Sequence, residues 1–260
     1  MTAARLERLH DGRVARVTLA APKANILDRA MVTELSAIFD ALAGDRDLCA
    51  IVLAADGPHF SFGASVEEHL PEQIEEALAR LSGLLRNVGG APAPTIASVR
   101  GQCLGGGFEL VLACDLVVAE ETAQLGAPEI RLGVFPPAAA ALLPVRVGVA
   151  GAASMILTGA SSTGAQAMAS GLVTRIAPPG QLDVAVDEFL GECFLTRSPV
   201  ALRNAAHAVR GPIVRALNED LPRLERLYLD ELMTDPDAVE GIRAFLDKRD
   251  PQWTRRRSTP

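Results

Sequence analysis

Runs of apolar residues alternate with helix-like patterns over the first half of the chain. A strand is predicted over residues 14–19, and mainly apolar runs predict strands buried on both faces of a sheet over residues 50–54, 95–99 and 115–119. After the first strand, apolar positions recur at helical spacing behind Asp28, a residue type that caps helix N-termini. Further helices are predicted over residues 67–87 and from Gly105 through Leu112. This alternation predicts an α/β fold with a parallel sheet.

From residue 150 onward the pattern is mainly helical. Helical spacing extends over six segments: 150–157, 164–169, 181–195, 199–217, 220–233 and 236–247. A single strand is predicted near residues 172–176. Because the last helices are too small a set to enclose a core of their own, we expect them to pack on the main body or on another subunit.

Composition and charge narrow the class of protein. The chain has 260 residues, 49% of them hydrophobic, which suits one large domain or a domain with an appendage. Its formal net charge is -7 and its isoelectric point is near 5.2, whereas a general nucleic-acid surface needs a basic footprint. We therefore expect no nucleic-acid partner. An anionic ligand could bind only through a local cluster of positive groups.

The cysteines and the N-terminus indicate the cellular setting. Cys49, Cys103, Cys114 and Cys193 are far apart and lack the spacing of metal ligands, so we expect buried apolar side chains and no metal. The N-terminus has no apolar core of a signal peptide, and no apolar run reaches the roughly 20 residues that span a bilayer. We expect a cytoplasmic protein with no membrane partner.

A triple glycine at residues 105–107 is the strongest local signal for a binding site. It lies between the strand that ends at Val99 and an apolar helix. Glycines let a ligand approach backbone N–H groups closely, and the first amides of a helix have no partner within it. Since the helix dipole also favours negative charge there, the segment could bind a phosphate or stabilise an oxyanion. Tight packing of strand against helix would need the same glycines, and no P-loop Lys-Ser or Lys-Thr pair follows.

A second loop, at residues 60–65, has the same character. It follows a buried strand, contains Gly63 and precedes a helix. Two such loops could direct two N–H groups at one carbonyl oxygen. For this loop alone, an ordinary strand-to-helix connection is the alternative. The neighbouring His59 and His69 border this loop and could contact a substrate, although such histidines are more often surface or helix-start residues.

Two glutamates in apolar surroundings are candidates for proton transfer. Glu109 lies in the first turn of the helix after the glycines, and Glu129 lies between Pro128 and Ile130. Burial against apolar side chains would raise their pKa values toward neutrality, which suits a general acid or base. Either glutamate alone could instead be exposed, or could complement a helix dipole.

Together these segments resemble the crotonase, or enoyl-CoA hydratase/isomerase, superfamily. Similar segments occur in the same order and spacing between about residue 5 and about residue 253: 63–65, 105–109, 113–116, 124–133 and 240–249. The resemblance implies a spiral of ββα units over residues 1–195, holding the coenzyme A site and the active site, and a helical oligomerisation (trimerisation) region over residues 196–260. It also implies a homotrimer or dimer of trimers, with an acyl-CoA thioester as substrate and no separate cofactor.

The resemblance assigns chemical roles by position. It implies oxyanion-hole amides at Ala64 and Gly106, where the thioester oxygen would bind as negative charge develops on it. Glu109 and Glu129 match the two glutamates of the hydratases, which handle the attacking water and the proton delivered to carbon. Both roles belong to one active site in that family.

The resemblance also implies contacts with coenzyme A. Lys23 and Ala24 match a loop near the adenine and phosphates, and Lys248 matches a C-terminal lysine that can approach a phosphate, often from another subunit. Three further residues of the two glycine loops are expected to contact the substrate: Gly63, Ser65 and Gly105.

One segment departs from the pattern of simple hydratases. After Pro136 these usually have Gly-Ala-Gly-Gly, whereas this chain has Pro137 followed by alanines. Proline has no N–H, and in simple hydratases a backbone amide near there helps to orient the catalytic water. The loop at residues 60–71 and the segment 133–136 are most similar to cyclic dienoyl-CoA hydratases of anaerobic benzoyl-CoA breakdown. The resemblance thus implies hydration of cyclohexa-1,5-diene-1-carbonyl-CoA to 6-hydroxycyclohex-1-ene-1-carbonyl-CoA.

Other functions stay open. The chain could hydrate straight-chain enoyl-CoA, or it could be a double-bond isomerase, which needs one carboxylate and no bound water. Outside the enzymes, it could be a non-catalytic CoA-binding or RNA-binding member of the same fold. The glutamate pair and the acidic charge both argue against this last function.

Overall fold

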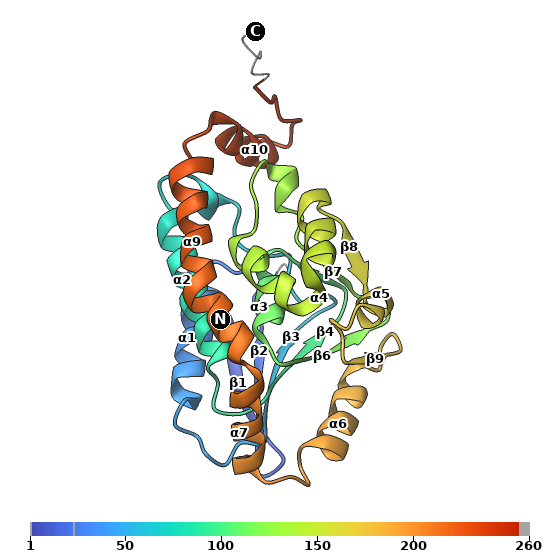
Figure 1. Ribbon diagram of the computed structural model, residues 1–260. Coiled ribbons are helices and arrows are strands. Elements are labelled where there is room, and N and C mark those ends of the chain that lie inside the picture. Colours follow the sequence, from blue (N-terminus) through green and yellow to red (C-terminus); the bar gives the residue numbers. More distant parts are fainter. Residues whose placement is uncertain (1, 23, 255–260) are drawn as a thin grey trace.

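The larger of two sheets has six strands, in the order β1-β2-β3-β4-β6-β9 (Figure 1). The computed structural model describes residues 2–22 and 24–254. The strands of this sheet are β1 (Ala4–Leu9), β2 (Val14–Leu19), β3 (Ala50–Ala55), β4 (Thr95–Val99), β6 (Leu116–Glu120) and β9 (Arg175–Ala177). Strand β1 pairs antiparallel with β2, and the other neighbours pair in parallel. Every residue of β3 and β4 is buried, which accounts for their mainly apolar sequences, and the predicted α/β fold is confirmed.

A second, three-stranded sheet has the order β5-β7-β8. Its strands are β5 (Gln102–Leu104), β7 (Gln124–Gly126) and β8 (Ser161–Thr163). The chain runs from β4 into β5 and then α3 (Gly106–Ala113), and from β6 into β7 and then η2 (Glu129–Leu132). Each such turn adds one strand to each sheet before a helical segment, as in the expected ββα spiral. The short strands were not predicted, because three residues are too few to show a period.

Two helices, α1 (Arg29–Leu42) and α2 (Ile74–Gly89), pack against each other beside the large sheet (Figure 1). The Asp28 side chain accepts a 2.9 Å hydrogen bond from the Met31 N–H, so the predicted cap is confirmed. The prediction of one helix over residues 67–87 is wrong. A 3₁₀ turn, η1 (Glu67–His69), ends at Leu70, whose ψ of 152° is extended because Pro71 follows it.

Helix α4 (Pro137–Thr158) begins well before the predicted segment at residue 150. Its length and composition are sufficient to cross a membrane. Gly148, however, has φ 73° and ψ 166° and breaks the helix into two parts. The Arg146 guanidinium donates a 2.7 Å hydrogen bond to the Leu112 carbonyl, and the first half of the helix is largely buried. The buried first half is typical of a helix in a protein core, whereas in the second half only Ala152 and Met155 are buried.

The C-terminal third is built from short helices that follow one another closely. They are α5 (Gly164–Ala169), α6 (Leu182–Cys193), α7 (Pro199–Val209), α8 (Gly211–Arg215), η3 (Ala216–Asp220), α9 (Leu221–Arg226), η4 (Leu227–Leu232) and α10 (Pro236–Leu246). Helix α9 packs on α4, and the preceding turn η3 contacts both α2 and α4. The predicted single helix over residues 199–217 is interrupted after Val209.

A buried ion pair holds this C-terminal region on the core. The Arg210 guanidinium lies 2.6 Å from the Asp115 carboxylate, and both side chains are nearly inaccessible. Arg210 also donates a 2.8 Å hydrogen bond to the Ala93 carbonyl. The region therefore packs on the main body, as one of the two expected arrangements. Of the cysteines, three are buried as predicted, whereas Cys193 at the end of α6 is exposed.

Candidate active site

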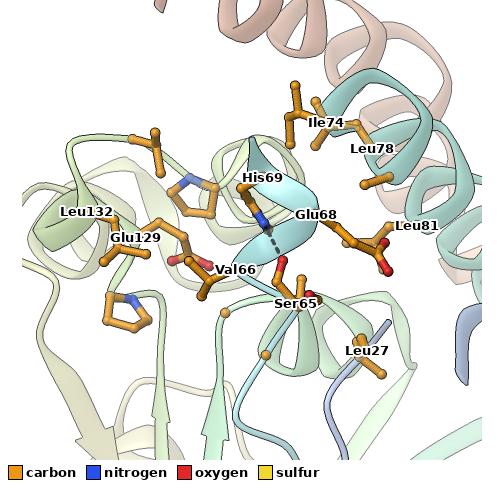
Figure 2. Close-up of a pocket in the computed structure, with 18 of the residues that line it drawn as sticks. Leu27, Ser65, Val66, Glu68, His69, Ile74, Leu78, Leu81, Glu129 and Leu132 are labelled. Carbon is orange, nitrogen blue, oxygen red and sulfur yellow. Dashed lines mark hydrogen bonds between the residues drawn. The ribbon is translucent and has the colours of Figure 1, made fainter. Parts of the chain in front are cut away.

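A cavity of about 460 Å³ lies between the two glycine loops and the helices that cover them. Figure 2 shows the Glu129 carboxyl group on one side of it and side chains of α2 on another. The wall is mainly apolar, and its aliphatic members include Leu27, Val66, Ile74, Leu78, Leu81 and Leu132. A largely apolar cavity with a few inward polar groups is typical of a small-molecule site.

The two glycine loops touch each other at the floor of this cavity. A Cβ atom on Gly106 would lie 3.2 Å from the Ala64 nitrogen, so only a glycine permits this approach without displacement. Gly63 has φ 105°, a conformation that favours glycine. The Ser61 hydroxyl accepts from the Gly63 N–H at 3.0 Å and donates to the Asn25 carbonyl at 2.7 Å. These contacts fix the loop that carries Ala64 against the start of α3.

The N–H groups of Ala64 and Gly106 are both unused. Within residues 2–22 and 24–254, neither one donates to a carbonyl or side chain. Gly106 opens α3, where the first amides have no partner in the helix, and both residues line the cavity. Two free N–H groups at adjacent positions can stabilise a negatively charged oxygen between them.

Glu109 is held in the first turn of α3, with 4% of its surface exposed. Its Oε1 accepts a 2.8 Å hydrogen bond from the Ala139 N–H, in the first turn of α4. Burial raises the pKa of Glu109 from 4.5 to about 7, although the amides of Ala139 and Ala138 lower it, and the charge of Glu225 raises it further. The prediction that burial brings this carboxyl toward neutrality is thus supported by its surroundings.

Glu129 lies in η2 and faces the same cavity (Figure 2). The residue as a whole is partly exposed, but its Oε2 is buried and has no hydrogen-bond partner among the described residues. Burial raises the pKa of Glu129 from 4.5 to about 8, and the charge of Glu109 raises it further. Two carboxyl groups that oppose each other's ionisation titrate as a pair and share one proton over a range of pH.

His69 and three arginines also line the cavity. The His69 Nδ1–H donates to the Ser65 carbonyl at 2.8 Å, and burial lowers the pKa of the imidazole, which favours its neutral form (Figure 2). The Arg80 guanidinium pairs with Glu68 and Glu76, and that of Arg249 pairs with Glu240 and Asp247, so these carboxylates offset the arginine charge. The Arg131 guanidinium donates a 2.9 Å hydrogen bond to the Gly159 carbonyl.

Most of the predicted site residues meet at this cavity. Seven of them line it: Gly63, Ala64, Ser65, Gly105, Gly106, Glu109 and Glu129. Ala24 does not line it, but its carbonyl accepts a 3.0 Å hydrogen bond from the Phe62 N–H and so supports the loop that does. Lys248 is exposed beyond α10 and also lies outside the lining. Lys23 lies outside the described residues.

The C-terminal helices contribute residues that the sequence did not indicate. Tyr228 of η4 and Gly241 and Phe245 of α10 line the cavity. The prediction confined the active site to residues 1–195, and the lining extends past that boundary because η4 and α10 fold over the cavity. Helical spacing shows that a segment has an apolar face, but it does not show what that face covers.

The chain is similar to known proteins over nearly its whole length, in both sequence and structure. Residues 10–256 match the family described as enoyl-CoA hydratase/isomerase. The chain is 44% identical over 251 residues to the cyclohexa-1,5-dienecarbonyl-CoA hydratase of Thauera aromatica, covering 96% of each protein. It is 38% identical over 250 residues to a probable enoyl-CoA hydratase of Rhizobium meliloti, covering 94% of this chain and 96% of that one. The crystal structure of an enoyl-CoA hydratase from Mycobacterium avium subsp. paratuberculosis superposes with a TM-score of 0.85 at 27% identity, covering 97% of this chain and 98% of that one.

Proposed function

Because the chain belongs to the enoyl-CoA hydratase/isomerase family, we propose that it adds water to an α,β-unsaturated acyl-CoA thioester. The main evidence for this reaction is one structural observation. Two glutamates with raised pKa values, the buried Glu109 and the partly buried Glu129, line the same cavity as two unused backbone N–H groups. Carboxyl groups that titrate near neutrality can transfer protons, and the free N–H groups can stabilise the enolate oxygen that forms meanwhile.

The surroundings of the two carboxyl groups distinguish their roles. Glu109 accepts hydrogen bonds from two amides in the first turn of α4, which favour its ionised form. Glu129 accepts only from its own backbone amide and has the higher pKa, so we assign the shared proton to Glu129. Glu109 is then the base that takes a proton from water as the water oxygen bonds to the β carbon. The thioester oxygen gains negative charge at Ala64 and Gly106. Glu129 then delivers its proton to carbon, which completes the addition of one water.

We propose a cyclic dienoyl-CoA as the substrate, cyclohexa-1,5-diene-1-carbonyl-CoA. Hydroxide would add at the β carbon, and the proton would return at the far end of the conjugated system, giving the 6-hydroxycyclohex-1-ene product. The 44% identity to a protein of that name supports this substrate. The cavity wall also includes Ile74, Val134 and Tyr228, which belong to one packed apolar cluster and suit an apolar acyl group. A place in benzoyl-CoA degradation follows if this substrate is correct.

Two further expectations concern assembly. We propose a homotrimer or a dimer of trimers, in which Lys248 reaches the phosphates of coenzyme A bound to a neighbouring subunit. Exposed apolar residues on α4, such as Val149 and Leu157 at 75% and 69% exposure, support a surface that another subunit covers. Light scattering of the purified protein at several concentrations tests the proposed assembly. The expectations of a cytoplasmic protein without a separate cofactor stay predictions.

Side-by-side assays of the purified protein test the proposed reaction. We expect a much higher kcat/KM for cyclohexa-1,5-diene-1-carbonyl-CoA than for crotonyl-CoA, because misplacing the water or proton donor by about 1 Å can cost roughly a hundredfold. The product should carry one oxygen atom from ¹⁸O-labelled water. Equal or faster hydration of crotonyl-CoA would favour a general enoyl-CoA hydratase. A shifted double bond without label would favour an isomerase, and binding without any turnover would favour a non-catalytic protein.

A further inference from the structure

Two buried polar atoms in the cavity wall have no partner. Among the described side chains that line the cavity, these are the Oε2 of Glu129 and the hydroxyl oxygen of Tyr228. The buried Nη1 of Arg80 is different, because it lies 2.8 Å from the Glu76 carboxylate. A buried polar group without a hydrogen bond destabilises the protein, so such a group in a ligand cavity indicates a contact made when the ligand is bound.

The ring of Tyr228 is held rigidly in η4. The residue is 1% exposed and packs edge-on against Phe135, with ring centroids 5.5 Å apart at 63°. It belongs to the same apolar cluster as Ile74 and Ile242, which join α2 and α10. Because the ring is enclosed on these sides, the direction of its hydroxyl group is fixed by packing.

Tyr228 stays a hydrogen-bond donor at the pH of catalysis. Burial raises the pKa of its phenol, and the charges of Glu129 and then Glu109 raise it further. The charges of these two carboxyl groups, which line the same cavity, thus help to keep the phenol protonated. A neutral O–H near two carboxyl groups can donate to an oxygen that is bound between them.

The first turn of α4 leaves no amide free for a water molecule. Pro136 and Pro137 have no N–H. The next two amides, of Ala138 and Ala139, are directed at the Glu109 carboxylate. A donor to the attacking oxygen must therefore come from another element of the cavity.

We propose that the Tyr228 hydroxyl donates a hydrogen bond to the attacking oxygen, first as water and then as the hydroxyl group of the product. The inference rests on the proposed hydration reaction. It assigns the C-terminal region a role in orienting water, through a side chain in place of a backbone amide. No covalent step is added: the water still loses its proton to Glu109, and Tyr228 keeps its own.

The variant Tyr228→Phe removes this hydroxyl and keeps the ring. The matched control is Thr18→Val on β2, which removes a hydroxyl that is also buried and without a partner but lines no part of the cavity. We expect kcat to fall about tenfold or more in Tyr228→Phe, with little change in KM, and to stay unchanged in Thr18→Val. Neither variant should lower Tm, because each removes an unsatisfied group.

Binding provides a second measurement that does not require turnover. Calorimetry should show about tenfold weaker binding of 6-hydroxycyclohex-1-ene-1-carbonyl-CoA to Tyr228→Phe than to the wild type. Cyclohexanecarbonyl-CoA, which lacks the hydroxyl group, should bind both proteins equally. Unchanged kcat, or equal losses for both ligands, would overturn the assignment of Tyr228. If the wild-type protein hydrates no acyl-CoA, the proposed function fails, whereas the two affinities still report on the contact of Tyr228 with a hydroxyl group.

Discussion

The backbone N–H of Ala139 donates a 2.8 Å hydrogen bond to Oε1 of Glu109. This bond joins the first turns of α3 and α4 and places the carboxylate at the N-terminus of a second helix. Unsatisfied amides and the dipole at a helix N-terminus stabilise negative charge. The two glutamates are therefore unequal, because Glu129 accepts from its own amide and not from a second helix, and its pKa is raised further.

Replacing either glutamate by its amide should abolish most of the activity. We expect Glu109→Gln and Glu129→Gln each to lower kcat for acyl-CoA hydration by about a hundredfold or more, because each removes a positioned acid or base. Circular dichroism should show that both variants fold. The control Glu192→Gln changes an exposed glutamate on α6 that pairs with Arg175, and it should keep full activity. Near-normal hydration by either site variant would exclude that residue from the mechanism.

The raised pKa values also predict how stability depends on pH. A carboxyl group whose folded-state pKa exceeds its unfolded value binds its proton more tightly in the folded state. For Glu129 the stability of the folded protein therefore falls as the pH rises from 4.5 toward about 8. The variant Glu129→Gln cannot ionise, so its Tm should exceed that of the wild type by an amount that grows over this range. A difference in Tm that is constant with pH would show that the pKa of Glu129 is not raised in the folded protein.

The sequence predicted the parts of the site that depend on local chemistry. Strand β3 is an unbroken apolar run and β4 is a mainly apolar one, the glycines lie at the start of α3, and Glu109 comes two residues after Gly107. Their positions could therefore be inferred from neighbours in the chain. Pro71 is also a local signal, because the residue before a proline is biased away from helical backbone, and here it outweighs the longer helical pattern of residues 67–87.

The rest depends on contacts between distant segments. Tyr228 reaches the cavity only because η3, α9 and the helices before them run along α2 and α4, which no local period reveals. The hydrogen bond from Ala139 to Glu109 joins residues separated by 30 positions. The sequence showed that Pro137 lacks a donor, yet it could not show that the next amides serve Glu109.

Because Arg210 and Asp115 form a buried ion pair, replacing the Arg210 side chain by an uncharged one should markedly lower the stability of the protein. Arg210→Met would leave the Asp115 carboxylate nearly buried without its guanidinium partner, at 12% side-chain exposure. Removing one partner of a buried pair costs about 3–5 kcal/mol, so urea denaturation should show a fall of that order in the free energy of unfolding. Arg175→Met breaks an exposed pair with Glu192 and should change stability little. Equal effects of the two variants would show that Arg210 does not anchor the C-terminal helices.

Gly105 provides the sharpest test of the geometry that links the glycine loop to Glu129. A Cβ atom on Gly105 would lie 2.7 Å from Oε1 of Glu129, and the residue has φ 52°, which L side chains rarely adopt. Gly105→Ala should therefore displace the Glu129 carboxyl group and lower kcat by about a hundredfold, since a shift of about 1 Å at an acid–base group is enough for that loss. The control Gly171→Ala introduces similar backbone strain at φ 80°, with no atom within 4 Å of the added Cβ. Both variants should lose some Tm, and only Gly105→Ala should lose activity at temperatures where both are folded. Full hydration activity in folded Gly105→Ala would show that Glu129 can move without consequence, and it would remove this carboxyl group as the positioned acid.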